Sequence, residues 1–286
     1  MIKKIKYFAE SILIYLFFFI IKIFGIKLSR FIFSNLFIKI GPLLRSNSIV
    51  KDNLKKFSNE ISDKEVNSII SSVWSNYGKV FVEYMFLKKF RTNSDHIIIK
   101  NLSILEDVKN SEEPAIFVSG HFANFELMSM ELTKKNIKLA TIYRPLNNLF
   151  LNPLMEYLRK KFICPHQIKK GRLGVKDTIE YIKKSHSIAL MIDQRVSEGE
   201  KIKFFNHDAF TTTLPAQIAL KYKLKIIPIF LERKNDDKFE MVFYDPIDSK
   251  NFKDKSEISK KLNSVLEQML VKNPNQWIWT HNRWKL

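Results

Sequence analysis

Gly120-His121-Phe122-Ala123-Asn124-Phe125-Glu126 stands between a short apolar run, Ala115 to Val118, and a helix-like segment, Leu127 to Leu132. An apolar run, a polar turn and a helical pattern in this order are typical of a strand-to-helix unit in an α/β fold. If His121 and Glu126 shared one helix, their side chains would point about 140° apart, because each residue turns the helix by roughly 100°. If His121 lies in the turn and Glu126 in the first helical turn, the carboxylate can face the imidazole ring.

A histidine and a carboxylate in this arrangement predict a general base. The carboxylate would fix the imidazole tautomer and stabilise the imidazolium that forms on proton abstraction. The structural alternative is a polar turn in which Asn124 caps the helix and Glu126 is solvated. The organisation of the rest of the chain favours catalysis.

Short β-rich runs alternate with helical patterns from residue 91 onward. This alternation predicts an α/β domain with a mixed, largely parallel sheet flanked by helices. Active sites in such folds gather at the carboxyl ends of the strands. Strands are expected near 96–100, 114–119, 138–143, 187–192, 225–231 and 238–244, and helices near 122–135, 147–161, 173–184, 213–222 and 254–272.

Other polar side chains also follow predicted strands or begin predicted helices. Arg144 ends one strand and suits a phosphate or carboxylate, although a surface salt bridge is the alternative. Arg172 begins a helix, where backbone N–H groups favour anions, and a solvated charge cluster explains it equally well. Asp193 and Gln194 follow another strand, where they either face a site or brace a loop.

The amino-terminal segment is apolar enough to meet a membrane. Residues 7–26 form 20 mainly apolar residues, which is long enough to span a bilayer. No small-residue cleavage site follows, so we expect a retained anchor over residues 1–27 that either spans the membrane or lies in its interface. Residues 28–90 are expected to be an amphipathic and helical lead-in that packs on the core or the membrane, and residues 91–286 the catalytic domain.

Charge and cysteine content narrow the function classes. Lys plus Arg number 48 against 29 Asp plus Glu, a net charge of +19, which favours an anionic partner. A nucleic-acid-binding protein would explain this charge but not the apolar segment, and the sequence has no recognisable nucleic-acid-binding module. The single cysteine, Cys164, excludes an internal disulfide and a Cys-rich zinc site, and the histidines lack metal-ligand spacing. A non-enzymatic membrane scaffold would leave His121 and Glu126 without a role.

Taken in order, these motifs resemble the lipid A biosynthesis acyltransferases, the late lauroyl/myristoyl transferases. These belong to a wider group with a His-x4-acidic motif that includes the glycerophosphate acyltransferases. The resemblance covers most of the chain. It rests on the apolar amino-terminal segment, residues 119–126, Tyr143-Arg144-Pro145, Arg172, Asp193-Gln194 and residues 276–285.

This resemblance implies an O-acyltransferase with a glycerophosphate-acyltransferase-like fold and no cofactor or metal. It implies transfer of a fatty acyl group from a thioester, acyl-carrier protein in this family, to a hydroxyl of a phosphorylated lipid A precursor. The enzyme would lie at the bacterial inner membrane with its catalytic domain on the cytoplasmic face. The alternative is an acyltransferase for another glycolipid or a lysophospholipid, with acyl-coenzyme A as a second candidate donor.

The resemblance also implies roles for individual residues. His121 would be the general base, and Glu126 would hold and stabilise its imidazolium. Substrate contacts would come from Arg144, Arg172, Asp193 and Gln194.

Overall fold

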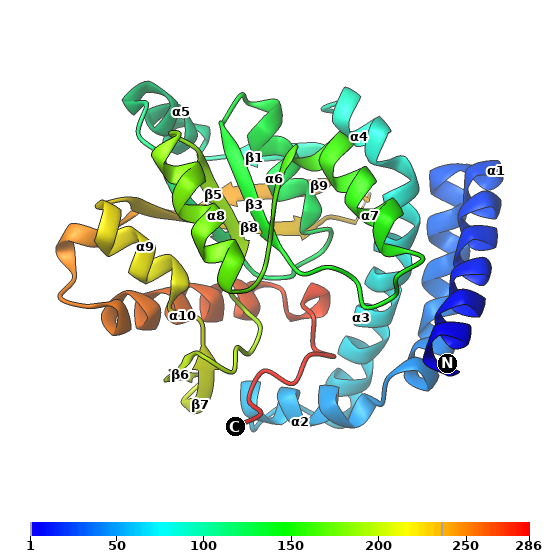
Figure 1. Cartoon of the computed structure of the whole chain (residues 1–286). Coiled ribbons are helices and arrows are strands. Elements are labelled where there is room, and N and C mark those ends of the chain that lie inside the picture. The colour runs from blue at the N-terminus through cyan, green and yellow to red at the C-terminus, as the bar shows by residue number, and fades with distance from the viewer. Residues whose placement is uncertain (1, 236) are drawn as a thin grey trace.

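A mixed sheet forms the centre of the protein in the computed structural model, which describes residues 2–235 and 237–286 (Figure 1). Eight strands take part, in the order β1-β9-β8-β2-β5-β3-β4, with β10 paired to β8. The strands from β8 to β4 run parallel, whereas β9 and β10 run antiparallel to β8. The expected mixed, largely parallel sheet is therefore confirmed. Its strands are β1 (Ile97–Lys100), β2 (Ile116–Ser119), β3 (Leu139–Tyr143), β4 (His166–Lys169), β5 (Ser187–Met191), β8 (Lys225–Arg233), β9 (Phe239–Phe243) and β10 (Ile247–Asp248).

Helices cover both faces of this sheet because side chains of successive strand residues point to opposite faces. Phe117 and Ala189 contribute to the core beneath one set of helices, and Ile116 and Ile188 to the core beneath the other. The first set comprises α4 (Leu87–Thr92), α5 (Leu102–Ser111), α6 (Glu126–Lys134) and α7 (Asn152–Leu158), which continues into a π-helical turn, Arg159–Ile163. The second set comprises α8 (Arg172–Lys183), α9 (Leu214–Tyr222) and α10 (Lys255–Lys272).

Two features of the sheet region were not predicted. The edge strand β4 lacks a long apolar run, since only Ile168 of its four residues is buried. Strands β6 (Glu200–Phe204) and β7 (His207–Thr211) form a separate antiparallel hairpin. Its turn residues, Phe205 and Asn206, both have positive φ, 49° and 60°, as tight hairpin turns require.

The amino-terminal helix α1 (Ile2–Leu44) is a helical hairpin, because it bends back on itself at Gly25. Gly25 has φ 72° and ψ 172°, a conformation that glycine adopts without steric cost. Residues equally distant from the bend meet: the rings of Phe17 and Phe33 lie 5.4 Å apart, and the Ser29 hydroxyl donates to the Ile21 carbonyl at 3.2 Å. We call residues 2–24 the first arm and residues 26–44 the second arm.

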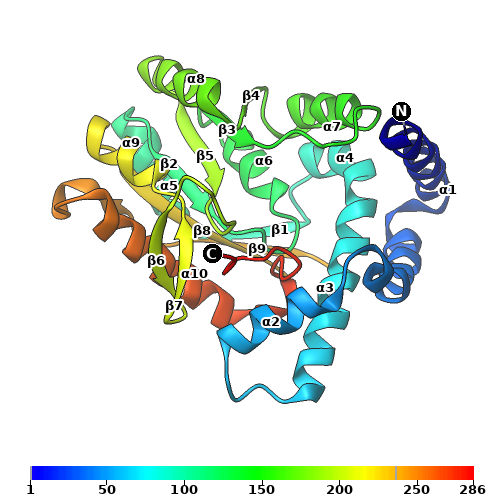
Figure 2. The same ribbon diagram turned by 60° about the horizontal axis from the view of Figure 1, so that its bottom comes forward.

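Both arms lie beside α3 (Asp63–Glu83), as the two ribbon views show (Figure 1, Figure 2). The ring of Phe81 contacts rings from both arms, including Phe18 at 5.0 Å and Phe33 at 5.6 Å. Gly78 permits this close approach, since a Cβ atom there would overlap the backbone of Phe33. The short helix α2 (Asn47–Phe57) connects the hairpin to α3.

The outer face of the hairpin remains apolar and exposed. By length and composition, α1 is the one helix among the described residues that could cross a membrane. Phe8, Ile12, Phe19 and Phe31 are each more than half exposed. The first arm is nevertheless attached to the protein, because the Asn148 amide donates to the Tyr7 carbonyl at 2.9 Å.

Candidate active site

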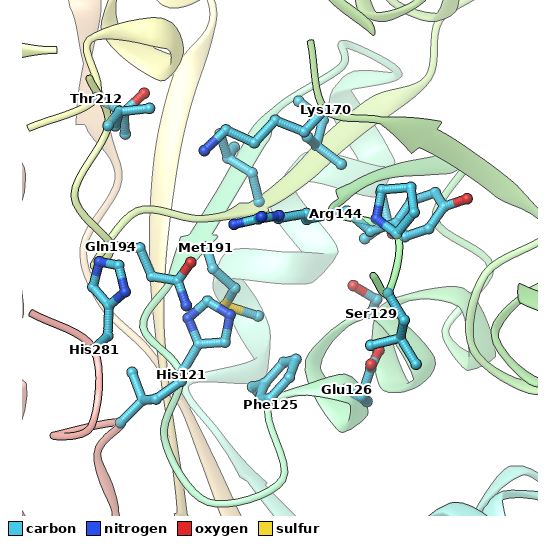
Figure 3. Close-up of a pocket in the computed structure, with 18 of the residues that line it drawn as sticks. His121, Phe125, Glu126, Ser129, Arg144, Lys170, Met191, Gln194, Thr212 and His281 are labelled. Atoms are coloured by element: carbon cyan, nitrogen blue, oxygen red, sulfur yellow. The ribbon is translucent and has the colours of Figure 1, made fainter. Parts of the chain in front are cut away.

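Polar side chains that follow the parallel strands converge on one pocket of about 530 Å³ (Figure 3). His121 follows β2, Arg144 follows β3, Lys170 follows β4 and Gln194 follows β5, and all four line this pocket. Parallel strands bring their carboxyl ends to the same edge of the sheet, which is why residues so distant in sequence meet.

The imidazole of His121 is held by a buried carboxylate from the neighbouring strand end. His121 Nδ1 lies 2.7 Å from Asp193 Oδ1, and the His121 backbone N–H donates to Asp193 Oδ2 at 2.7 Å. The Trp277 indole N–H donates to the same Oδ2 at 2.7 Å. With Nδ1 engaged, the Nε2 atom of His121 is left as the ring nitrogen for the pocket.

Asp193 is fully buried and therefore has no surface for substrate. Burial alone would raise the pKa of this carboxyl, but the charge and hydrogen bonds of His121 outweigh burial, and the pKa lies below its ordinary value. An ionised carboxylate beside Nδ1 fixes the ring tautomer and stabilises the imidazolium that forms on proton abstraction. The family resemblance implied a substrate contact for Asp193, and its position after a strand left a loop-bracing role open. In the structure its carboxylate binds the ring and the backbone N–H of His121.

Glu126 also differs from expectation, since its carboxylate does not serve His121. Glu126 Oε1 accepts from the Tyr84 hydroxyl at 2.6 Å and from Arg159 Nη2 at 2.6 Å and Nε at 2.8 Å. The ring of Phe125 packs on the His121 ring instead, with centroids 4.6 Å apart. The expected contact between Glu126 and His121 is therefore corrected. A buried guanidinium needs a carboxylate partner, and the carboxylate of Glu126 forms this ion pair with Arg159.

Arg159 is a pocket residue that the sequence did not single out. Burial would lower the pKa of this guanidinium, but the charge of Glu126, with hydrogen bonds to Glu126 and Tyr84, reverses the effect and the pKa is raised. Its Nη1 atom is buried and has no hydrogen-bond partner among the described residues. In sequence Arg159 precedes two lysines and looks like part of a solvated basic run.

The loop between β2 and α6 has an unusual backbone. Ala123 has a positive φ of 46°, which a residue with a Cβ atom rarely adopts. Its N–H donates to the Gln276 carbonyl at 3.0 Å, and its carbonyl accepts from the Asn76 amide at 3.2 Å. Contacts from two distant segments thus impose the conformation of the loop that carries His121.

Three cations line the rim of the pocket, and the acidic Glu198 lies near enough to one of them, Lys170, to interact with its charge. The side chains of Arg45, Arg144 and Lys170 line the pocket and make no hydrogen bond or ion pair with any described residue. Burial and the nearby Arg144 lower the pKa of Lys170, against the opposite effect of Glu198. Arg172 begins α8, is exposed and is not one of the pocket-lining residues. The rim therefore favours an anionic ligand at Arg144 and Lys170 rather than at Arg172.

His281 also lines the pocket, near Gln194 and His121, as Figure 3 shows. Its Nε2 atom accepts from the Arg195 backbone N–H at 2.9 Å. Burial, with added repulsion from His121 and Arg283, lowers the pKa of His281 to about 4. The ring is consequently neutral at physiological pH.

His281 should make the stability of the protein depend on pH. Its folded pKa of about 4 lies below the ordinary value of 6.5, so between these values the unfolded chain binds more protons. Stability contributed by the neutral ring is complete above pH 6.5 and is lost as the pH falls towards 4. His281→Gln keeps an acceptor for the Arg195 backbone N–H but has no group that titrates in this range. The melting temperature of the variant should therefore fall less between pH 7 and pH 4 than that of the wild-type protein. Identical profiles for the two proteins would contradict the prediction.

Over residues 2–235 and 237–286, no group of three or more His, Cys, Asp or Glu side chains is placed to bind a metal ion. The pocket instead contains a histidine with a buried carboxylate partner and a rim of cations.

Comparison with known proteins identifies the family of this chain. The family model described as bacterial lipid A biosynthesis acyltransferase matches residues 2–286. The lipid A biosynthesis lauroyltransferase of Escherichia coli (strain K12) is 22% identical over 247 residues, 84% of this chain and 79% of the relative. The palmitoleoyltransferase of the same organism is 22% identical over 250 residues, covering 85% and 80%. The 1-acyl-sn-glycerophosphate acyltransferase PlsC from Thermotoga maritima aligns over 88% of this chain and 99% of its own, with a TM-score of 0.43 and 15% identity. The chain therefore belongs to the bacterial lipid A biosynthesis acyltransferase family and is an O-acyltransferase of the late lipid A type.

Proposed function

We propose that this enzyme transfers a fatty acyl group from acyl-carrier protein to a hydroxyl of a phosphorylated lipid A precursor, with His121 as the general base. The observation that carries the proposal is the His121–Asp193 pair at a pocket whose rim holds cations. The pair supplies a base, and the cations suit a phosphorylated acceptor.

In the proposed reaction, His121 Nε2 takes the proton of the acceptor hydroxyl while the hydroxyl oxygen attacks the carbonyl carbon of the thioester. The new C–O ester bond forms, the C–S bond breaks, and the imidazolium returns the proton to the leaving thiolate. Ionised Asp193 stabilises the imidazolium in between. Glu126 acts in this scheme by neutralising Arg159 next to the start of α6, and Gln194 contacts substrate from the end of β5.

Arg144 and Lys170 are proposed to bind the phosphates of the acceptor. Replacing either one by alanine should raise the KM for a phosphorylated acceptor by roughly tenfold or more, because a charge-assisted hydrogen bond contributes about 1.5–3 kcal/mol. The Arg172→Ala variant is a matched control, since this exposed arginine follows the same strand as Lys170 but lies outside the pocket. Steady-state kinetics at several acceptor concentrations measures the effect. An equal rise in KM for Arg172→Ala would contradict the assignment.

The proposal also includes attachment of the enzyme to the membrane through its amino-terminal segment. Residues 1–27 would anchor the enzyme, residues 28–90 would form the lead-in, and residues 91–286 would carry the chemistry. The exposed apolar side chains of α1 and the lysines at its start suit an anionic bilayer surface. A cytosolic acyl-carrier protein requires the pocket to face the cytoplasm, so we place the enzyme at the cytoplasmic face of the bacterial inner membrane.

The direct test uses purified wild-type enzyme, acyl-carrier-protein thioester and a tetra-acylated phosphorylated lipid A precursor. Mass spectrometry of the lipid should show one added acyl group. Parallel reactions offer acyl-coenzyme A as donor and a lysophospholipid as acceptor. Transfer confined to either parallel reaction would overturn the proposed donor and acceptor.

A further inference from the structure

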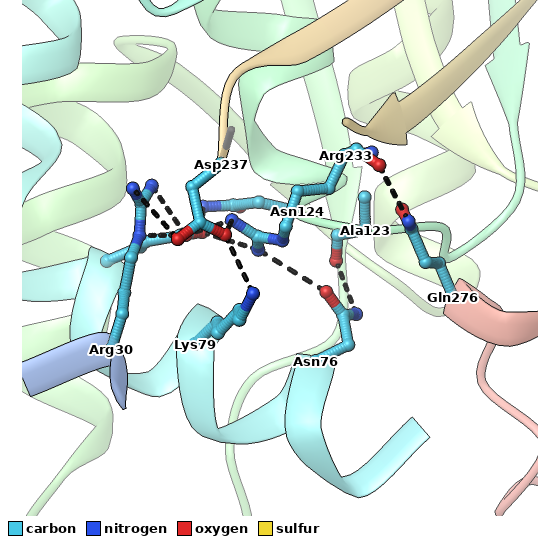
Figure 4. A network of polar contacts seen from close by, with 9 residues as sticks. Arg30, Asn76, Lys79, Ala123, Asn124, Arg233, Asp237 and Gln276 are labelled. Atoms are coloured by element: carbon cyan, nitrogen blue, oxygen red, sulfur yellow. Dashed lines mark hydrogen bonds and ion pairs between the residues drawn. The ribbon is translucent and has the colours of Figure 1, made fainter. Parts of the chain in front are cut away.

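Glu83, at the end of α3, belongs to a buried charge network outside the pocket. Figure 4 labels its partners Arg30, Asn124 and Arg233. Its carboxylate is fully buried and accepts from Arg30 Nε at 2.8 Å, from Arg233 Nη2 at 3.1 Å and from the Asn124 amide at 2.8 Å. Burial would raise the pKa of Glu83, but the charges of Arg233 and Arg30 outweigh it, and the pKa lies below its ordinary value. Glu83 is therefore a charged acceptor with partners from three separate parts of the chain.

These partners connect the hairpin to the loop that carries His121. Arg30 belongs to the second arm of α1, Arg233 ends β8, and Asn124 lies three residues after His121. Arg233 also donates to the Asn76 side chain at 3.3 Å, and Asn76 in turn donates to the Ala123 carbonyl. Asn124 and the positive-φ residue Ala123 are thus both held by the network.

We propose that Glu83 and Arg30 are positioning residues: the docked second arm, through Arg30 and Glu83, holds Asn124 and sets the geometry of the His121 loop. The proposal rests on the proposed function for its kinetic consequence but not for its structural one. Arg30 supplies one of the two guanidinium groups that keep Glu83 charged in the interior. Without it, Arg233 is the one cation among the described residues that still pairs with Glu83, so the carboxylate is drawn towards Arg233 and its hold on Asn124 weakens.

The test compares Glu83→Gln and Arg30→Met with a matched control, Glu131→Gln. Glu131 of α6 is also a buried carboxylate, and it pairs with Lys134 of the same helix and with His96, which precedes β1, rather than with the loop. Both network variants should lower kcat by about ten- to a hundredfold with acceptor KM unchanged, as small displacements of a reacting group do. The Glu131→Gln variant should keep the wild-type kcat.

Amide hydrogen exchange of residues 120–125 gives a readout that needs no substrate. Exchange should accelerate in Glu83→Gln and Arg30→Met but not in Glu131→Gln, and Arg30→Lys should restore part of the protection. Equal acceleration in the control, or unchanged exchange in both network variants, would overturn the proposal. If Glu83→Gln fails to fold, Arg30→Met carries the comparison alone, because Glu83 then keeps Arg233. A wild-type enzyme inactive towards the offered lipids would count against the proposed function only, since the exchange data still decide the positioning role.

Discussion

Replacement of His121 by alanine is expected to lower kcat for acyl transfer by a factor of about 10²–10⁴, which is the usual contribution of a positioned general base. Among the described pocket residues, the cations cannot accept the hydroxyl proton, and the Nε2 atom of His281 already accepts from the Arg195 backbone. The Glu126 carboxylate is paired with Arg159. The measurement is the initial rate of lipid acylation by mass spectrometry at saturating donor and acceptor.

The fold should survive this replacement. Asp193 keeps its hydrogen bonds to the residue 121 backbone N–H and to Trp277 when the imidazole is removed. A melting temperature close to that of the wild-type enzyme would confirm that lost activity reflects lost chemistry. Activity within a few-fold of the wild-type rate in such a folded variant would rule out His121 as the base.

Asp193→Asn should reduce kcat about as strongly as His121→Ala, by a factor of about 10²–10⁴. With its amide nitrogen towards the ring, the new side chain donates to Nδ1 and forces the ring proton onto Nε2. That tautomer cannot accept the substrate proton. The kinetic measurement is the same, with acceptor KM followed separately because Asp193 does not contact the pocket.

Glu126→Gln should be compared with Asp193→Asn, because the two variants test which carboxylate supports His121. It should destabilise the enzyme by about 3–5 kcal/mol, because the buried charge of Arg159 loses its carboxylate. The kcat of the folded fraction should fall much less than in Asp193→Asn, since His121 keeps its own partner. If both variants lost kcat equally and Glu126→Gln remained fully stable, the result would indicate that Glu126, and not Asp193, supports His121 in catalysis.

The central strands and part of the pocket could be predicted from local patterns. The apolar runs at β2, β3 and β5 are unambiguous, and the residues that follow them, His121, Arg144 and Gln194, do meet. Strand β4 has no such run, so its terminal Lys170 was not distinguished from the neighbouring Arg172. Only the direction of the chain at the end of β4 decides which of the two cations faces the pocket.

The partner of His121 could not be predicted, because spacing along the chain reports only local geometry. Glu126 is five residues away and Asp193 is 72 residues away, yet the sheet order places β5 directly beside β2. Glu83 was equally inconspicuous, since sequence analysis recognised it only as part of a helical segment. Its importance depends on partners 53 and 150 residues distant.

The hydrogen bond from Trp277 to Asp193 has a consequence for biosynthesis. Ribosomes make a chain from its amino end at about 5–20 residues per second. The apolar hairpin thus emerges well before the segment that carries Trp277, and it can reach the bilayer while the carboxylate behind His121 still lacks its indole partner. In the proposed membrane-anchored enzyme, delivery to the bilayer would precede completion of the active site, and a nascent chain would already lie at the membrane when it becomes competent for catalysis.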